Sequence, residues 1–155
     1  VLISPDAGAT KRTLKFAKIF SLDTIIMHKQ RNYKKANTIE KIMIIGDANQ
    51  YKNKIGIICD DMIDTGGTLI AAIDTLVENG IKHVIFIGTH GILSGPAIDR
   101  INNCDALQKV IVSDSLDQTQ NCTRCPKLKV FSIGNIIKDA INSIISNNSL
   151  SELFL

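Results

Sequence analysis

The sequence predicts a doubly wound, mainly parallel α/β domain. Short aliphatic runs alternate with stretches of helical periodicity along the whole chain, which is typical of βαβ folds. The expected strands are mostly apolar on both faces, as in a sheet buried between helices. With 155 residues, 45% hydrophobic and 21% charged, the chain has the size and core material of one domain. The hydrophobic share excludes disorder. The low content of 10 Gly and 3 Pro excludes collagen-like and low-complexity classes.

The expected elements follow one another in βαβ order. Aliphatic runs predict strands at 1–4, 24–28, 54–59, 83–88, 109–113 and 127–132, with a small strand at 40–46. Apolar residues at helical spacing predict helices at 9–20, 68–78, 96–103 and 135–145. The polar stretch 29–38 is long enough for a mobile loop. In such sheets ligands bind at the carboxyl ends of the strands, so the chemistry is expected just after Ser4, His28, Cys59 and Gly88.

Each long helix carries an apolar face that predicts which side packs on the sheet. In helix 9–20 the face consists of Leu14, Ala17 and Phe20. In helix 68–78 it consists of Leu69, Ala72, Ile73, Leu76 and Val77, and Asn79-Gly80 ends the helix. Helix 135–145 carries Ile136, Ile137, Ala140, Ile141, Ile144 and Ile145.

Charge is nearly balanced overall but uneven along the chain. Lys and Arg total 18 against 15 Asp and Glu, a net charge of +3 that does not indicate nucleic-acid binding. Nine of the basic residues lie within residues 1–41, against three acids. The bias fits a bound anionic small molecule, and it fits a solvated basic face equally well.

The targeting signals and the cysteine content predict a cytoplasmic location. No apolar stretch approaches the ~18 residues needed to span a bilayer, and the first residues do not follow a signal-peptide pattern. Cys122 and Cys125 have C-x-x-C spacing, but no second Cys or His pair supports a zinc site. With Cys59 and Cys104 they are predicted to be reduced, structurally incidental thiols.

The segment 57–68 carries the strongest functional pattern. It runs from a buried strand through Asp60, Asp61 and Asp64 into Thr65-Gly66-Gly67-Thr68 at the start of a helix. The glycines allow a tight turn, helix N-termini favour anions, and Thr68 suits an N-cap. Three carboxylates beside a phosphate would repel it unless they accept sugar hydroxyls or hold Mg²⁺. The pattern therefore indicates a phosphorylated sugar, the alternative being an acidic turn before an N-capped helix.

This segment resembles the phosphoribosyl-pyrophosphate binding motif of type I phosphoribosyltransferases and phosphoribosyl-pyrophosphate synthetases. Further segments resemble the synthetases, in order along nearly the whole chain: 4–12, 28–31, 89–97 and 149–154. The resemblance is to the C-terminal half of ribose-phosphate diphosphokinase of the phosphate- and ADP-regulated class. It implies a type I phosphoribosyltransferase fold for residues 1–155, with the family's N-terminal half absent from this chain and Val1 close to a domain boundary.

The resemblance implies a role for each matching residue. Asp60, Asp61, Asp64, Thr65, Gly66, Gly67 and Thr68 would bind ribose 5-phosphate, with acids on the hydroxyls and the Gly-Gly-Thr turn on the phosphate. Lys29 and Arg31 match the catalytic cations, although a Lys and an Arg in a basic loop also fit a solvated surface. Charge develops on the leaving AMP and around the β-phosphorus, which cations on a closing loop would stabilise.

Residues at the two ends of the chain match a pyrophosphate loop and a regulatory site. Asp6, Ala7, Gly8 and Ala9 match the loop that faces the pyrophosphate, and Asp6 matches a Mg²⁺ ligand or is a simple turn acid. Ala9 stands where the family usually has Gly, which is tolerated if its φ is negative. Ser149, Ser151 and Phe154 match a phosphate and nucleotide site between subunits, or form a plain polar tail. His90 fits a buried structural histidine and receives no catalytic role.

The implied reaction transfers pyrophosphate from Mg-ATP to the C1 hydroxyl of ribose 5-phosphate, giving phosphoribosyl pyrophosphate and AMP. Phosphate and ADP would regulate it, in a homo-oligomer assembled from dimers into hexamers, without nucleic acid or membrane. Two alternatives stay open: a phosphoribosyltransferase that adds a nucleobase, and a non-catalytic regulatory subunit on the synthetase fold. We expect these 155 residues to bind ribose 5-phosphate weakly and not to make phosphoribosyl pyrophosphate.

Overall fold

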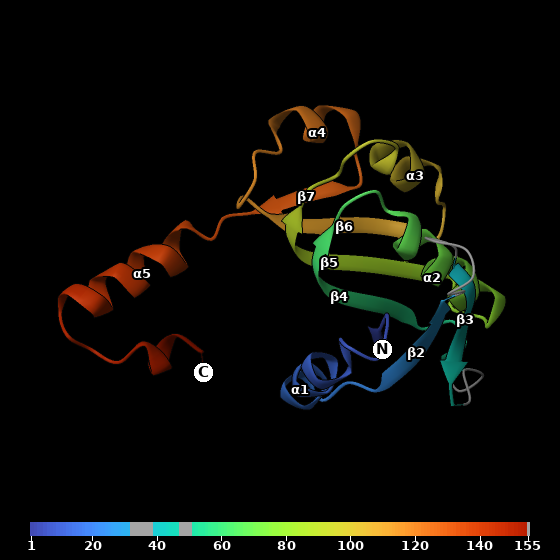
Figure 1. The fold of residues 1–155 in the computed structure, drawn as a ribbon, viewed down its shortest axis with the longest axis horizontal. Helices are drawn as coiled ribbons and strands as arrows, with labels where there is room; N and C mark the ends of the chain where they lie inside the picture. The colour runs from blue at the N-terminus through green and yellow to red at the C-terminus, as the bar shows by residue number, and fades with distance from the viewer. Residues whose placement is uncertain (32–38, 47–50, 155) are drawn as a thin grey trace.

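The computed structural model describes residues 1–31, 39–46 and 51–154, with only the backbone of 29–31, 39–41, 152 and 154 (Figure 1). Its strands are β1 (Leu2–Ser4), β2 (Thr24–Arg31), β3 (Ile39–Ile45), β4 (Ile55–Ile63), β5 (His83–Gly91), β6 (Leu107–Ser113) and β7 (Leu128–Phe131). Its helices are α1 (Thr10–Phe20), α2 (Gly67–Glu78), α3 (Ala97–Asn103), α4 (Thr119–Arg124) and α5 (Gly134–Ile145), followed by the 3-10 helix η2 (Leu150–Phe154).

One sheet of seven strands, in the order β3-β2-β1-β4-β5-β6-β7, organises the fold. All neighbouring strands run parallel except β2 and β3. The chain moves from β1 to β2 in one direction and from β4 to β7 in the other, so right-handed crossovers place α1 on one face and α2 to α4 on the opposite face. The predicted doubly wound α/β class is confirmed.

The core lies where the central strands meet α2 and α3. Ile58, Val84 and Val110, on three neighbouring strands, have no exposed surface. Ile73 of α2 and Ile101 of α3 are equally inaccessible and belong to the same buried cluster. Branched aliphatic side chains pack well on a pleated surface, which explains why this sheet needs few aromatic residues.

The predicted strands are confirmed, but several extend further than predicted. Strand β4 continues to Ile63 and β5 to Gly91, because polar residues at their ends still pair, for example Asp60 with Gly88 and Met62 with His90. The prediction of a loop from residue 29 is wrong for 29–31, which continue β2 and pair with β3, and residues 32–38 lie outside the described part. Helix α4 and η2 were not predicted, because segments of six and five residues are too short to show a helical period, and α4 is mostly polar.

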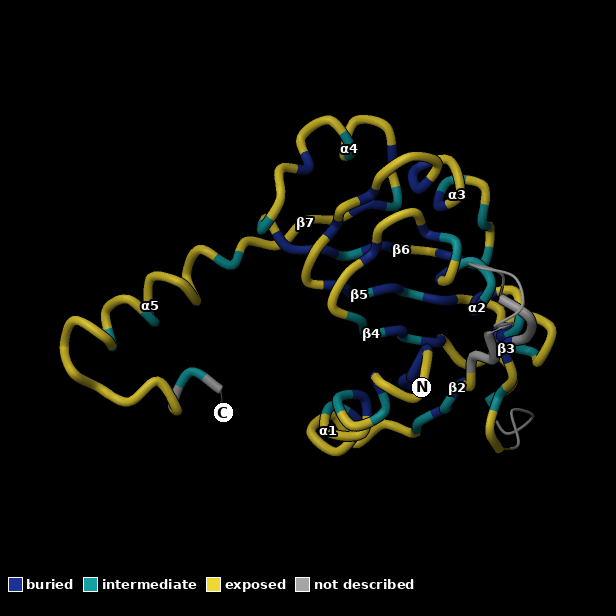
Figure 2. The backbone as a smooth tube through the Cα atoms, in the orientation of Figure 1, coloured by how far each residue is buried: buried dark blue, intermediate teal, exposed yellow. Residues whose placement is uncertain are grey.

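The predicted apolar faces fare differently from helix to helix (Figure 2). In α2 all predicted face residues are buried except Val77, which is 44% exposed. In α1 the prediction is right for Ala17, which is buried, and wrong for Leu14 and Phe20, which are exposed, while Thr13 is the other buried residue of the helix. Helix α5 has no buried residue and extends away from the β7 edge of the sheet (Figure 1).

The structure also bears on the expectations about thiols and membrane spans. All four cysteines are free, and burial raises the pKa of Cys59, which disfavours a reactive thiolate. None of the helices in the described ranges is long and apolar enough to cross a membrane.

Candidate functional site

A cavity of about 410 Å³ opens at the carboxyl edge of the sheet, between β1 and β4. Pro5 and Asp6 line it from the turn after β1, and residues 60–68 line it from the end of β4 through the start of α2. The strand order reverses between β1 and β4, because the next strand in the chain lies to one side of β1 and to the other side of β4. In open α/β sheets this switch point is where ligands bind, so the fold forms the predicted site there.

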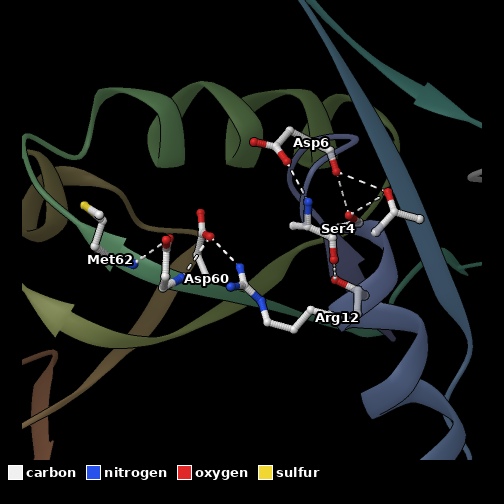
Figure 3. Close-up of polar contacts among 9 residues, drawn as sticks. Ser4, Asp6, Arg12, Asp60 and Met62 are labelled. Carbon is white, nitrogen blue, oxygen red and sulfur yellow. Dashed lines mark hydrogen bonds and ion pairs between the residues drawn. The ribbon is translucent and has the colours of Figure 1, made fainter.

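The wall after β1 is a tight turn held by its own side chains (Figure 3). The Ser4 hydroxyl donates to the Asp6 carbonyl over 2.8 Å and lies 3.3 Å from the Thr10 hydroxyl. Asp6 Oδ1 accepts the Ala9 N–H at 2.9 Å, just before α1 begins. Ser4 is fully buried and Asp6 is exposed, so the turn is anchored in the sheet while its carboxylate borders the cavity.

Ala9 fits this turn without backbone strain. Its φ is −78°, in the region open to any L-residue, and its side chain is buried. A Cβ at Gly8, by contrast, would lie 3.3 Å from Asp6 Oδ1, closer than side chains normally approach. A side chain at position 8 would therefore require the Asp6 carboxylate to shift by a few tenths of an ångström, whereas position 9 accommodates the methyl group of alanine.

The wall after β4 begins with two acids that were predicted to lie on a loop but belong to the strand. Asp60 is part-buried and Asp61 is exposed, and each accepts the backbone N–H of the residue that follows it, at 2.9 and 3.0 Å. Burial is the main reason that the pKa of Asp60 is raised above its ordinary value. The neighbouring Asp60 carboxyl lowers the pKa of Asp61, so Asp60 takes up a proton first on acidification.

The turn between β4 and α2 has the form expected for an anion-binding helix N-terminus. Gly66 has a φ of +76°, a conformation that glycine adopts at no steric cost, and it is the N-cap of α2. The prediction of Thr68 as N-cap is wrong, because α2 begins one residue earlier, at Gly67, and Thr68 lies in its first turn. The first turn of a helix presents backbone N–H groups without intrahelical acceptors, and its dipole favours negative charge.

Two side chains from the segment after β5 brace this turn. The Ser94 hydroxyl donates a short hydrogen bond to Asp64 Oδ1, and Arg100 Nη1 donates to the Thr65 carbonyl over 2.8 Å. Ser94 lies in segment 89–97, which resembles the synthetases, but neither Ser94 nor Arg100 was predicted to be a site residue. Their partners lie 30 and 35 residues away in the chain, so no local pattern signals the pairing.

Arg12 is a third site residue that sequence reasoning missed. From the first turn of α1 its Nη2 reaches Asp60 Oδ1 at 2.7 Å, joining the two walls of the site (Figure 3). The two side chains are 40% and 31% exposed, so the ion pair is partly shielded from water. Part of the basic bias of the first 41 residues thus has a structural partner within the site.

The predicted catalytic cations lie on the part of β2 that projects beyond β1. Ser4, the last residue of β1, pairs with Ile26, and β2 continues to Arg31. Lys29 is three residues past Ile26, roughly 10 Å along the strand. The pairing with β3 is irregular between Gln30 and Arg31. The backbone of Lys29 and Arg31 therefore lies past the carboxyl edge of β1, and their side chains lie outside the described structure.

The acids around the cavity supply oxygen donors for a cation without forming a complete cage. Asp6, Asp60, Asp61 and Asp64 all line it, and carboxylate oxygen is the donor that Mg²⁺ prefers. Within the described residues no three His, Cys, Asp or Glu side chains come together as a metal cluster. The donor set fits Mg²⁺ held by one or two carboxylates together with substrate oxygens and water.

The remaining predicted residues lie away from the cavity walls. Ser149 donates its hydroxyl to Ser151 over 3.0 Å in the exposed tail at η2, and Phe154 is described by its backbone alone. His90 was expected to be buried, but this prediction is wrong. It lies exposed at the end of β5, with its Nδ1 2.8 Å from the Ser115 hydroxyl. His90 is the strand neighbour of Met62 but does not line the cavity, and the structure does not bring Ser149 and Ser151 to it.

Comparison with known proteins agrees with this geometry. A family model described as the phosphoribosyl synthetase-associated domain matches residues 30–155. The phosphoribosylpyrophosphate synthetase from Mycobacterium smegmatis has 35% sequence identity and a TM-score of 0.81, over 95% of this chain and 45% of that one. This chain thus spans less than half the length of that relative.

More distant structures are similar in fold alone. The APRTase from Giardia lamblia has 15% identity and a TM-score of 0.54, over 68% of this chain and 65% of that one. The adenine phosphoribosyltransferase from Leishmania tarentolae has 19% identity and a TM-score of 0.51, over 76% and 63% of the two chains. With the closer match over nearly the whole chain, the resemblance inferred from sequence is confirmed. The chain belongs to the phosphoribosylpyrophosphate synthetase family.

Proposed function

We propose that the cavity between β1 and β4 binds ribose 5-phosphate. One observation carries the proposal: acids for sugar hydroxyls and a Gly-Gly helix N-terminus for a phosphate line the same cavity, at the switch point of the sheet. A bare phosphate would face the carboxylates without a sugar between them and should bind more weakly than a phosphorylated sugar, and a neutral sugar would leave the helix N-terminus unused. A phosphorylated sugar offers hydroxyl groups to the acids and a phosphate to the helix N-terminus.

The turn at Gly66 and Gly67 is the proposed phosphate end of the site. The positive φ of Gly66 turns the backbone into α2, and Thr65 and Thr68 supply hydroxyl groups on the same turn. Arg100 holds the Thr65 carbonyl, which keeps the turn open before ligand arrives. Such preorganisation lowers the entropic cost of binding the phosphate.

The acids of the β4 wall are the proposed sugar end. Asp60 and Asp64 each have one carboxylate oxygen held by a protein donor, Arg12 and Ser94 respectively. Their second oxygens are the expected acceptors for the sugar hydroxyls, with Asp61 contributing through metal-bound water. Asp6 and the turn to Ala9 would face the pyrophosphate, and Asp6 would hold Mg²⁺, which when bound neutralises phosphate charge.

For the whole protein we propose the synthetase reaction, with this chain as its C-terminal, phosphoribosyltransferase-like half. The C1 oxygen of ribose 5-phosphate forms a bond to the β-phosphorus of ATP, the bond from that phosphorus to the α-phosphate oxygen breaks, and AMP leaves. Lys29 and Arg31 would stabilise the charge that develops on the oxygens. Phosphate and ADP regulation near Ser149, Ser151 and Phe154, the homo-oligomer and the cytoplasmic location are parts of the same proposal.

The decisive experiment measures AMP formation from ATP and ribose 5-phosphate by the full-length protein. Lys29→Ala is expected to lower the rate by about 100-fold or more, because a cation at the transferring phosphoryl group is lost. Lys82→Ala serves as matched control, since Lys82 is exposed just before β5, at the opposite end of the sheet. Unchanged turnover in Lys29→Ala would refute its role. Pyrophosphate release on addition of a nucleobase, without AMP, would establish the phosphoribosyltransferase alternative.

A further inference from the structure

The ion pair between Arg12 and Asp60 links two elements that are far apart in the sequence. Arg12 is on α1, which follows the β1 turn, and Asp60 is near the end of β4, 48 residues later. The described ion pairs also include Lys54 with Asp23 and Lys138 with Asp139, and neither of these lies among the cavity residues. Arg12 therefore acts at one defined point, on the carboxylate at the sugar end of the site.

Several hydrogen bonds hold the Asp60 carboxylate in place. Oδ1 accepts Arg12 Nη2 at 2.7 Å and the Asp61 N–H at 2.9 Å. The Asp61 side chain also forms a hydrogen bond with the Asp60 carboxyl. A carboxylate held through one oxygen by two donors, one of them charged, has a fixed orientation. Asp60 is therefore held in a defined orientation at the edge of the cavity that it lines.

The position of Arg12 carries an energetic cost that stability alone does not explain. Its Nε is buried and has no hydrogen-bond partner among the described residues. An unpaired buried donor is costly, and each such group in a native structure calls for an explanation. A function of the guanidinium at Asp60 supplies one, since the same side chain donates its Nη2 to that carboxylate.

We propose that Arg12 is a positioning residue that orients the Asp60 carboxylate toward a sugar hydroxyl, and thereby sets the preference of the site for ribose 5-phosphate over phosphate alone. The inference rests on the proposed function of the cavity. Arg12 acts through Asp60 and not on the phosphate, whose proposed turn is braced by Arg100. Loss of Arg12 should accordingly weaken recognition of the sugar and leave phosphate binding at α2 intact.

The test compares two ligands on the 155-residue chain, ribose 5-phosphate and inorganic phosphate, by NMR titration of backbone amides. The ratio of their dissociation constants measures recognition of the sugar. We expect Arg12→Met to reduce this ratio about tenfold, as for one hydrogen bond involving a charged group, with phosphate affinity unchanged. Arg12→Lys keeps the charge but not the planar fork, so its ratio should lie between those of wild type and Arg12→Met.

Two arginine controls separate this role from a general charge effect. Arg124→Met, at the exposed end of α4, should leave both affinities unchanged. Arg100→Met should weaken both ligands alike, because it loosens the phosphate turn. Phosphate binding in Arg12→Met reports that the variant is folded. If Arg12→Met does not fold, the comparison is made with Arg12→Lys. A ratio of dissociation constants equal to that of wild type in Arg12→Lys then overturns the inference.

The outcomes distinguish this inference from the function on which it rests. If wild type binds ribose 5-phosphate no better than inorganic phosphate, the proposed function fails and the role of Arg12 fails with it. If wild type prefers ribose 5-phosphate and folded Arg12→Met keeps the full preference, the role of Arg12 is refuted while the proposed function stands. A reduced ratio with unchanged phosphate affinity supports both.

Discussion

Helices α2 and α5 have the same length of 12 residues and similar apolar patterning, yet their environments differ completely. In α2 the residues Leu69, Ala72, Ile73 and Leu76 are buried under the sheet. In α5 the five isoleucines are 50 to 75% exposed (Figure 2), and among the described residues the helix packs mainly against the chain's own tail at η2. A 3.6-residue period thus predicts a helix and its apolar face, but it does not say whether that face is covered.

The cause of the difference is topological. Helix α2 connects β4 to β5, two neighbouring parallel strands, and this crossover forces it back onto the sheet. Helix α5 follows β7, the strand at the end of the sheet order, and no later strand in the described chain returns it. The helix that the sheet constrains is also the one whose N-terminus forms the site.

The largest expected effect separates the two helices by stability. Ile73→Ala in α2 should lower the free energy of unfolding by about 2–5 kcal/mol, because it leaves a cavity in a fully buried position. Ile141→Ala in α5 should change it by less than about 0.5 kcal/mol, because that side chain is half exposed already. Urea unfolding followed by circular dichroism measures both. Equal losses would show that α5 packs on the sheet in solution.

A smaller effect distinguishes the glycines at the two helix starts. Gly66→Ala forces a Cβ into a left-handed conformation, which costs about 1–2 kcal/mol, although no neighbouring atom lies closer than 3.9 Å. Gly134→Ala at the start of α5 has no left-handed penalty, and its Cβ would lie 3.3 Å from the hydroxyl of the exposed Ser132, which can move aside, so stability should fall less than in Gly66→Ala. Urea midpoints and NMR titration with ribose 5-phosphate check this. Affinity for ribose 5-phosphate should fall in Gly66→Ala only, and an equal fall in both variants would contradict the assignment of the turn.

The smallest effect concerns one acid near the start of each helix. Burial raises the pKa of Asp60, on the strand that leads into α2, whereas hydrogen bonds from Ser132 and from the Ile133 N–H, just before α5, lower the pKa of Asp114, which follows β6. On acidification Asp60 should protonate first, so affinity for ribose 5-phosphate falls at a pH above the ordinary carboxyl value. The stabilisation from Asp114 is present above its unfolded pKa and is lost only as pH falls through its lowered pKa. Carboxyl ¹³C NMR titration checks this order, and the reverse order would refute it.

Much of the fold could be predicted because its signals are local. Aliphatic runs marked the cores of all the parallel strands, and the antiparallel strand β3 was expected almost within its observed limits. The ends of β4 and β5 were missed because strand pairing there includes Asp60 and His90, whose polarity suggested a loop. Pairing with a neighbouring strand satisfies their backbone groups, which side-chain character does not reveal.

The sequence by itself determined the βαβ order, the acidic Gly-Gly segment and the expectation of a phosphorylated sugar, because residue type and spacing within about a dozen positions specify them. Only the tertiary structure decided which residues meet across the switch point. Arg12, Ser94 and Arg100 join the site through partners 30 to 48 residues away. It also decided that α2 is covered and α5 exposed. Such pairings depend on strand order and crossover direction, and these arise only when the whole sheet forms.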